Sequence, residues 1–233
     1  MAAENRQDKA RRGLAILDRL GHAMPEARIE LDHQTPLQLL VSVILSAQCT
    51  DRRVNMVTPP LFKDFPTASH YAATTPEGLH PYLKTLGLYR AKSKALVALG
   101  AQLEVEHQGN VPLGRAALAA LPGVGNKTAG VVSMHLGGEE AFPVDTHVAR
   151  LSHRMGLATG KTPDKVEAQL QALLPKDRWF IGHQLLVWHG RRVCHARRPE
   201  CDRCVVNALC PKKGVKATAK PKPKPRSRLR ARP

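Results

Sequence analysis

The sequence lacks any apolar run approaching the ~20 residues that a membrane-spanning helix needs, so no membrane partner is expected. Residues 1–9 are polar and charged and lack the apolar core of a secretion signal, so we expect the chain to remain in the cytoplasm. Aromatic residues make up only 4% of the chain. No segment alternates apolar and polar residues for long, and therefore no strand is predicted.

The charge is strongly one-sided. Lys and Arg number 36 against 19 Asp and Glu, for a net charge of +17. Residues 211–233 hold ten of these Lys and Arg and no acid, which leaves +7 on the residues before them. A basic body with a basic, proline-rich tail predicts a polyanionic partner. The tail itself is expected to be disordered, with or without a specific partner, because its composition cannot bury a core.

Helical patterns dominate the rest of the chain. Pro36 begins a segment that is apolar nearly all round, as in a buried helix with proline at its first position. Pro and Gly clusters separate the expected helices. These helices are predicted at 11–24, 36–48, 89–107, after Asp145, after Pro163, and at 175–190. The fold class is therefore all-α, and 233 residues allow one large domain or two small ones.

Four of the five cysteines are clustered. Cys194, Cys201, Cys204 and Cys210 have the spacing C-x6-C-x2-C-x5-C. Because disulfides are rare inside cells, the pattern indicates four thiolates around a metal centre. Zinc and a [4Fe–4S] cluster both accept four thiolates, and the residues alone favour zinc, the commoner four-cysteine site. Histidine and arginine residues around the cluster would let this loop contact phosphates.

A glycine-rich turn joins two predicted helices at residues 118–134. In its Pro-Gly-Val-Gly sequence, Gly123 and Gly125 permit a tight turn and the close approach of another backbone. The free N–H groups of the following helix would then form an anion site suited to a phosphate. An ordinary helix–turn–helix corner is the alternative.

Two polar residues follow this turn and are candidates for chemistry. Lys127 lies in the first turn of the second helix, where a cation opposes the helix dipole. A neutral amine is the form that a Schiff-base nucleophile needs, although the position alone favours a phosphate contact. Asp145 precedes a helix and by itself reads as an N-cap. His147 could support Asp145 or be an ordinary surface residue.

These motifs occur in one order along the chain: 121–129, 144–147 and the four cysteines. In that order they resemble the endonuclease III family of helix–hairpin–helix glycosylases, bacterial type. Segments 45–51 and 85–89 add two further matches, and the resemblance extends over residues 11–212. Each motif is common alone, but the combination is specific.

The resemblance implies two helical lobes that flank a DNA-binding cleft. A six-helix barrel with the helix–hairpin–helix would span 29–139, and residues 1–28 with 140–212 would form the other lobe. The disordered basic tail would be 213–233. The four cysteines would hold a structural [4Fe–4S] cluster, which replaces zinc as the expected group.

The resemblance also implies a function in base excision repair: a bifunctional DNA glycosylase and class I AP lyase that removes oxidised pyrimidines from duplex DNA. The enzyme would act as a monomer in the cytoplasm, associated with the nucleoid, on damaged bases or abasic sites. Lys127 matches the catalytic lysine, and Asp145 matches the catalytic aspartate.

The remaining expected site residues would contact DNA. Gln48 matches a residue that fills the gap left by the flipped base, and Leu88 matches a wedge in the base stack. The other expected DNA contacts are Gly123, Gly125, His147 and Arg191.

The sequence departs from the family pattern at several positions. Asn126 stands where relatives usually carry Arg, Gly130 where Asn is common, and Cys49 where a small residue is usual. Pro59-Pro60 interrupts a stretch that is usually helical. Three rival functions are disfavoured. An adenine glycosylase generally lacks the lysine, a DNA-binding module without chemistry would have lost Lys127 or Asp145, and an iron–sulfur redox sensor would not need segments 45–51 and 85–89.

Overall fold

The computed structural model describes residues 4–215, and these residues form helices, turns and loops without a strand. The all-α prediction is therefore confirmed. The α-helices are α1 (Arg6–Ala23), α2 (Pro36–Leu45), α3 (Asp51–Asp64), α4 (Ala68–Ala72), α5 (Pro76–Leu83), α6 (Tyr89–His107), α7 (Arg115–Ala119), α8 (Asn126–His135), α9 (Thr146–Arg154), α10 (Pro163–Leu173) and α11 (Trp179–Arg192). Short 3₁₀ helices are η1 (Lys176–Arg178), η2 (Cys201–Arg203) and η3 (Asn207–Leu209).

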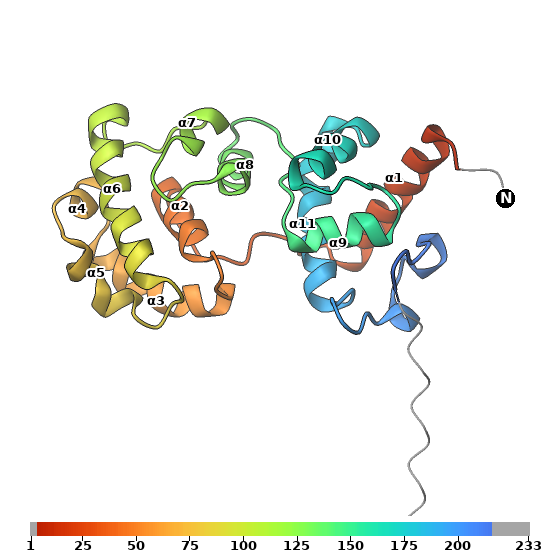
Figure 1. Ribbon diagram of the computed structural model, residues 1–233, viewed down its shortest axis with the longest axis horizontal. Coiled ribbons are helices and arrows are strands. Elements are labelled where there is room, and N and C mark those ends of the chain that lie inside the picture. Colours follow the sequence, from red (N-terminus) through yellow and green to blue (C-terminus); the bar gives the residue numbers. More distant parts are fainter. Residues whose placement is uncertain (1–3, 216–233) are drawn as a thin grey trace, which may run out of the picture.

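The helices form two lobes that lie side by side (Figure 1). The barrel lobe comprises α2 to α8, and its core runs from Leu31 to Val132. The cluster lobe comprises α1, α9, α10, α11 and the cysteine segment, around a second core that joins Leu17 and Leu20 of α1 to the C-terminal helices. The chain therefore crosses between the lobes twice, at residues 24–35 and 136–145. The domain bounds 29–139 and 1–28 with 140–212 stay predictions.

The same local signal begins three of the helices. In the Thr-Pro dipeptides at 35–36, 75–76 and 162–163 the threonine is the N-cap and the proline is the first helical residue, whereas the fourth Thr-Pro, at 58–59, lies within α3. The threonine hydroxyl accepts a backbone N–H, and the proline needs no hydrogen-bond partner at this position. These caps fix where the short connections end and the core-forming helices begin.

Three local features differ from the sequence prediction. α1 begins at Arg6, because Asn5 caps it by accepting the Asp8 N–H at 2.8 Å. The helix expected from residue 175 starts as η1 and becomes α-helical only at Trp179. Pro59-Pro60 does not interrupt helix α3, which continues through both prolines. Both are exposed, so water can reach the carbonyls that lose their N–H partners.

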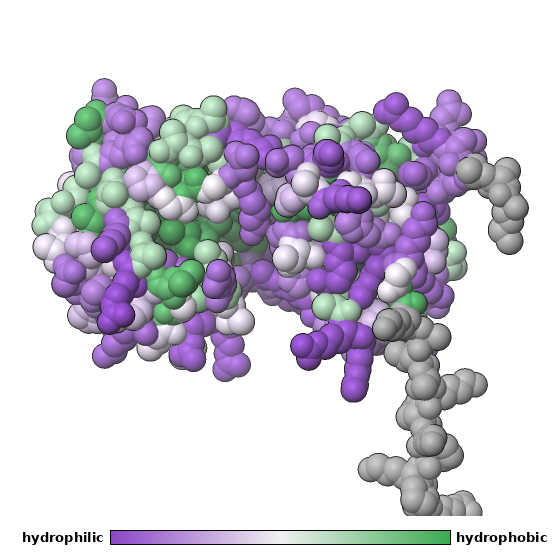
Figure 2. Space-filling view, viewed as in Figure 1, coloured by the Kyte–Doolittle hydropathy of each residue, from purple (hydrophilic) through white to green (hydrophobic). Residues whose placement is uncertain are grey.

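The surface of both lobes is mostly hydrophilic, and hydrophobic residues show mainly on the half that contains α2 to α8 (Figure 2). No helix within residues 4–215 has the length and apolar character that crossing a membrane requires. Most of the expected basic tail, residues 216–233, lies outside the described residues.

Candidate active site and cysteine cluster

A cavity lies between the two lobes and brings together the predicted catalytic pair. Lys127 enters it from α8 of the barrel lobe, and Asp145 enters from the start of α9 in the cluster lobe. Its other charged and polar lining residues are Arg28, Glu30, Ser46, Asp51, His135, His183, Gln184 and Arg191. Residues separated by up to about 160 positions thus meet in one site.

The glycine-rich turn presents the N-terminus of α8 at this cavity. Gly123 has a φ of +77°, and a Cβ there would lie 2.9 Å from the Cβ of Ala95, so the turn requires glycine. Gly125 is the N-cap with an ordinary φ of −91°, and a Cβ there would meet nothing within 4 Å. The protein itself therefore does not need glycine at 125, but an approaching backbone or phosphate would. Lys127 follows in the first turn and is exposed.

Asp145 is an N-cap and also faces the cavity. Its Oδ1 accepts the Val148 N–H at 2.8 Å, so the structural interpretation of this residue is confirmed. No hydrogen bond to Oδ2 is recorded within residues 4–215, and this second oxygen is available to a substrate. The cap fixes the side-chain rotamer that directs the carboxylate.

One buried and one half-buried histidine, His183 and His135, line the cavity beside Lys127 and Asp145. His183 Nδ1 lies 2.9 Å from the Pro143 carbonyl, which can only accept, so this nitrogen carries the proton. Burial lowers the pKa of His183 to about 4, partly opposed by the charge of Asp145, so the ring is neutral at pH 7. His135 Nδ1 likewise donates to the Val131 carbonyl, and its Nε2 accepts from the Gln184 amide at 2.6 Å. Burial also lowers the pKa of His135.

The predicted gap-filling and wedge residues lie on adjacent loops. Gln48 and Leu88 both have left-handed backbones, with φ of +56° and +60°, which is uncommon for residues other than glycine. Both are exposed, Leu88 by 56%. A Cβ at Gly87 would lie 3.6 Å from the Gln48 carbonyl oxygen, which shows that the two loops touch. Strained, exposed residues on touching loops are suited to probing a base stack.

Lys92 fastens these two loops together and was missed at the sequence level. Its buried ammonium donates to the carbonyls of Leu45 and Ala47 at 2.9 and 2.8 Å, and lies 3.2 Å from Cys49 Sγ. The backbone N–H of Lys92 donates to the Leu88 carbonyl. The signal was available, because Lys92 lies on the same helix face as buried Leu96 and a buried lysine must have partners.

His147 and Arg191 lie near the cavity but do not bond Asp145. His147 Nδ1 is 3.1 Å from the Arg150 guanidinium, and burial lowers its pKa. Arg191 pairs with Glu30 and Asp51 at the cavity mouth. Neither acidic partner of Arg191 was singled out from the sequence, since Glu30 in a connection and Asp51 at the start of α3 carry no periodic signal.

The four cysteines line one cavity at the end of the cluster lobe, beside Arg154 and His189. No three or more His, Cys, Asp or Glu residues among the described ones are placed to hold a single metal ion. Four cysteines around one cavity fit the four thiolate ligands that a [4Fe–4S] cluster takes. Burial raises the pKa of the Cys204 and Cys210 thiols, and neighbouring cysteines add to it, so cations are needed to hold four thiolates together.

The departure at Gly130 has a structural reason. A Cβ there would lie 3.1 Å from Pro143 and 3.5 Å from the guanidinium carbon of Arg115. Arg115 uses this space to reach Glu167 of the cluster lobe in a two-point ion pair at 2.8 and 3.0 Å. Asn126, by contrast, is exposed at the start of α8, and nothing in the structure explains its presence.

Comparison with known families gives two matches that together span most of the chain. Residues 41–176 match the HhH-GPD superfamily of base excision DNA repair proteins. Residues 194–210, from the first to the last clustered cysteine, match the iron–sulfur binding domain of endonuclease III.

Curated relatives and solved structures agree with these matches. Endonuclease III from Synechocystis is 42% identical over 87% of this chain and 93% of its own length, and that from Escherichia coli K12 is 40% identical over 88% and 97%. A trapped covalent endonuclease III–DNA intermediate is similar with a TM-score of 0.83 and 39% identity, covering 87% of this chain and 96% of its own. A thermostable thymine-DNA glycosylase at 20% identity, TM-score 0.78, shares the fold.

Proposed function

The chain belongs to the endonuclease III family of the HhH-GPD superfamily, and we propose that Lys127 and Asp145 are the residues that carry out its reaction. The function is that of a base excision repair enzyme, a DNA glycosylase with AP lyase activity on oxidised pyrimidines. Its cysteine segment carries a [4Fe–4S] cluster. The observation that supports the catalytic pair is that both side chains, from opposite lobes, line one cavity.

The reaction begins when the damaged nucleotide leaves the base stack, because its C1′ atom is inaccessible within the duplex. The exposed loops that carry Gln48 and Leu88 would fill the gap and offset part of the lost stacking. Gly123 and Gly125 would let the N–H groups of α8 approach a backbone phosphate. His147 would lie on the same DNA-facing side, beside the loop of Cys49 and Asp51.

The chemistry then uses one amine and one carboxylate. The neutral Lys127 Nζ attacks C1′, the C1′–N bond to the base breaks, and the base leaves with that electron pair and takes up a proton. The free Oδ2 of Asp145 stabilises the positive charge that develops on the sugar. Nζ then gives up a proton, the C1′–O4′ bond breaks as O4′ takes up a proton, and the nitrogen lone pair forms the C=N bond of an iminium. This iminium acidifies the C2′ proton, and removal of that proton breaks the C3′–O bond of the 3′ phosphate. Water finally hydrolyses the Schiff base and releases Lys127.

Cys194, Cys201, Cys204 and Cys210 would be the cluster ligands, and the cluster would supply a fixed scaffold rather than a reacting group. Around it, Arg154 donates to Cys194 Sγ at 3.3 Å and to the His195 carbonyl at 2.7 Å. These bonds orient the basic loop that follows α11. DNA is the partner, and we propose that one chain acts alone on duplex carrying a damaged base or abasic site, because it supplies both catalytic residues.

The test is borohydride trapping on duplex DNA with one thymine glycol, comparing wild type with Lys127→Ala. A covalent adduct with wild type and none with Lys127→Ala is expected, while both proteins bind the DNA. Near-normal strand cleavage by Lys127→Ala would refute the assignment. Tight binding without any wild-type adduct would instead indicate a glycosylase without lyase activity.

A further inference from the structure

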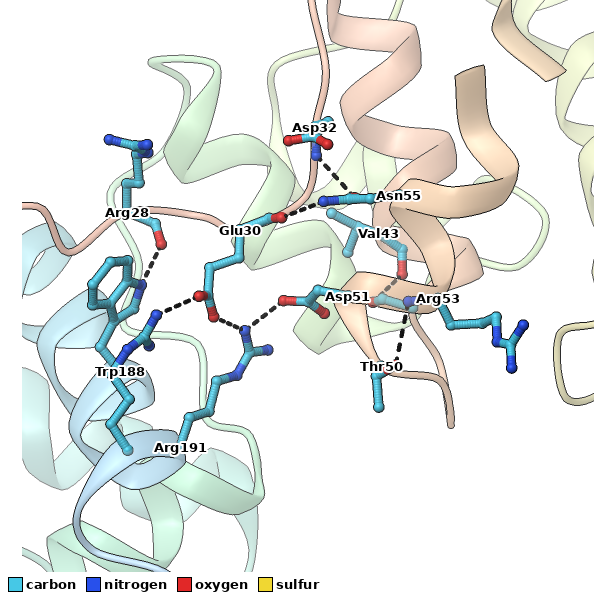
Figure 3. Close-up of polar contacts among 12 residues, drawn as sticks. Arg28, Glu30, Asp32, Val43, Thr50, Asp51, Arg53, Asn55, Trp188 and Arg191 are labelled. Atoms are coloured by element: carbon cyan, nitrogen blue, oxygen red, sulfur yellow. Dashed lines mark hydrogen bonds and ion pairs between the residues drawn. The ribbon is translucent and has the colours of Figure 1, made fainter. Parts of the chain in front are cut away.

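A network of charged side chains joins the two lobes at the mouth of the active-site cavity (Figure 3). Glu30 lies in the connection 24–35, and its carboxylate accepts from Arg191 and Arg192 of α11 at 2.5 Å each. Arg191 also donates to Oδ2 of Asp51, the first residue of α3. One guanidinium of the cluster lobe is thus bound to the connection and to the barrel lobe together.

Hydrogen bonds from both lobes hold the connection 24–35 in place. On the cluster side, Trp188 Nε1 donates to the Arg28 carbonyl at 2.5 Å. On the barrel side, Asn55 Nδ2 donates to the Glu30 carbonyl at 2.8 Å, and Asn55 Oδ1 accepts the Asp32 N–H at 3.1 Å. The segment 28–32 is therefore fixed to both lobes, and Glu30 lies between Asn55 and Arg191 (Figure 3).

The charges of this network are matched and partly shielded from water. The Asp51 side chain is only 15% exposed and that of Arg191 32%. Burial alone would raise the pKa of Glu30, but hydrogen bonds from Arg192 and Arg191 outweigh it and the pKa lies below its ordinary value. Arg192 is itself held by stacking on Trp188, 3.7 Å from the ring centroid. Removing one member would leave an uncompensated charge at the lobe boundary.

This position matters because Lys127 and Asp145 belong to different lobes, so contacts between the lobes set their mutual geometry. We propose that Arg191 is a positioning residue, which holds Glu30 and Asp51 together and so fixes the lobes where Lys127 meets Asp145. The inference rests on the proposed catalytic roles of that pair. It differs from a phosphate contact, because both carboxylates already neutralise the guanidinium. Experiment can distinguish this positioning role from the predicted contact of Arg191 with DNA.

The lobes keep other links when this network is broken, so the variants are expected to fold. Arg115 pairs with Glu167, and Gln184 bonds His135, independently of Arg191. A matched control is available within the cluster lobe, where Arg178 pairs with Asp18 and is 30% exposed. Arg178→Gln and Asp18→Asn therefore repeat the charge changes of Arg191→Gln and Glu30→Gln without touching the network.

The measurement is the single-turnover rate of borohydride trapping on abasic duplex DNA, together with the dissociation constant for a non-cleavable abasic analogue. Abasic DNA is chosen because it has no base that Glu30 or Asp51 could recognise. Arg191→Gln, Glu30→Gln and Asp51→Asn should each slow trapping by about 10²-fold, the cost of misplacing reacting groups by roughly 1 Å. Their affinity should stay within about threefold of their charge-matched controls. Arg191→Lys, which can satisfy one carboxylate at a time, should recover part of the rate.

A phosphate contact would give the opposite pattern. Arg191→Gln would then weaken binding with little effect on the trapping rate of bound DNA, and Glu30→Gln would tighten binding by freeing Arg191. Slowing only on DNA that carries a damaged base would mean that Glu30 recognises the base. Either result would overturn the positioning role.

A second readout does not depend on catalysis. Spin labels introduced through non-natural amino acids at Val105 of α6 and Lys165 of α10, both exposed, report the distance between the lobes. Wild type should give one narrow distribution and Arg191→Gln a broader one, whereas Arg178→Gln should match wild type. Identical distributions for wild type and Arg191→Gln would overturn the inference. Because the labels report geometry alone, failure of wild type to form an adduct would refute only the proposed chemistry.

Discussion

Asp145 serves two purposes with its two oxygens. Oδ1 caps α9 through the Val148 N–H, and Oδ2 is free for the substrate. Because asparagine caps a helix about as well as aspartate, Asp145→Asn should leave the free energy of unfolding nearly unchanged while removing the charge. Single-turnover base release should then fall by at least about 10²-fold.

Asp145→Ala is the matched comparison, since it removes the cap as well and should cost about 1 kcal/mol of stability. Chemical denaturation measures the stability and thymine glycol release measures the rate. Equal base-release rates for wild type and Asp145→Asn would contradict the charge-stabilising role.

His183 gives the molecule a stability that depends on pH. Its folded pKa of about 4 lies below the ordinary 6.5, so the unfolded chain takes up a proton at higher pH than the folded chain does. The contribution is therefore fully present above pH 6.5 and is lost as pH falls toward 4, by up to about 1.4 kcal/mol per pH unit. The groups that face this ring are Asp145, Lys127 and His135.

His183→Gln should reduce the slope of the free energy of unfolding against pH by the uptake of about one proton. Glutamine can still donate to the Pro143 carbonyl but does not titrate. Denaturation at several pH values between 7 and 4.5 measures the slope. His70→Gln, at an exposed site, is the control for exchanging a histidine for glutamine. Equal slopes for His183→Gln and wild type would exclude His183 as the source.

At the scale of the element, the two glycines of the hairpin turn are expected to differ in role: Gly123 affects stability and Gly125 affects DNA binding. Gly123→Ala should lower the free energy of unfolding by roughly 1–2 kcal/mol, since φ is +77° and Ala95 is only 2.9 Å away. Gly125→Ala should fold normally, because a methyl group there meets nothing, yet it should weaken DNA binding. Thermal unfolding measures the stability of both variants, and titration with undamaged duplex measures their DNA binding. Unimpaired DNA binding by Gly125→Ala would contradict the phosphate-approach role.

The elements were predictable where the signal was local. The Thr-Pro dipeptides and the Asp145 cap set helix starts by backbone chemistry that needs no partner elsewhere. The start of α1 was predicted five residues too late, because the polar residues after its Asn5 cap carry no apolar periodicity. Continuation of α3 through Pro59-Pro60 was missed, because it depends on which face of the helix meets water.

The individual residues of the site were predictable, but the contacts that organise them were not. Lys127, Asp145 and the cysteines belong to short motifs with recognisable spacing. The partners that organise them come from distant positions: Lys92 beneath the Gln48 loop, and Glu30 with Asp51 around Arg191. The helix face of Lys92 indicated its burial, but the identity of these distant partners, within one lobe or across two, has no pattern in a single sequence.

At the scale of the whole molecule, the positive charge should act on DNA at long range. Deleting residues 213–233 removes nine of the ten tail charges. Because fewer counterions are released on binding, non-specific affinity should fall and the slope of log affinity against log salt should become shallower. Titrations of undamaged duplex at several salt concentrations measure both. Equal slopes for the full and shortened chains would mean that the tail takes no part in binding.

The double crossing between lobes also orders events on the ribosome. The barrel lobe is one continuous stretch and can close as soon as α8 emerges, but α1 must wait for its packing partners α10 and α11, the first of which begins at Pro163. At ~5–20 residues per second this is a delay of roughly 8–30 s. During that time Ile16, Leu17 and Leu20, fully buried in the finished protein, have no partner. The nascent chain therefore exposes the apolar face of α1 during this interval, and cluster insertion cannot be completed until Cys210 has been synthesised.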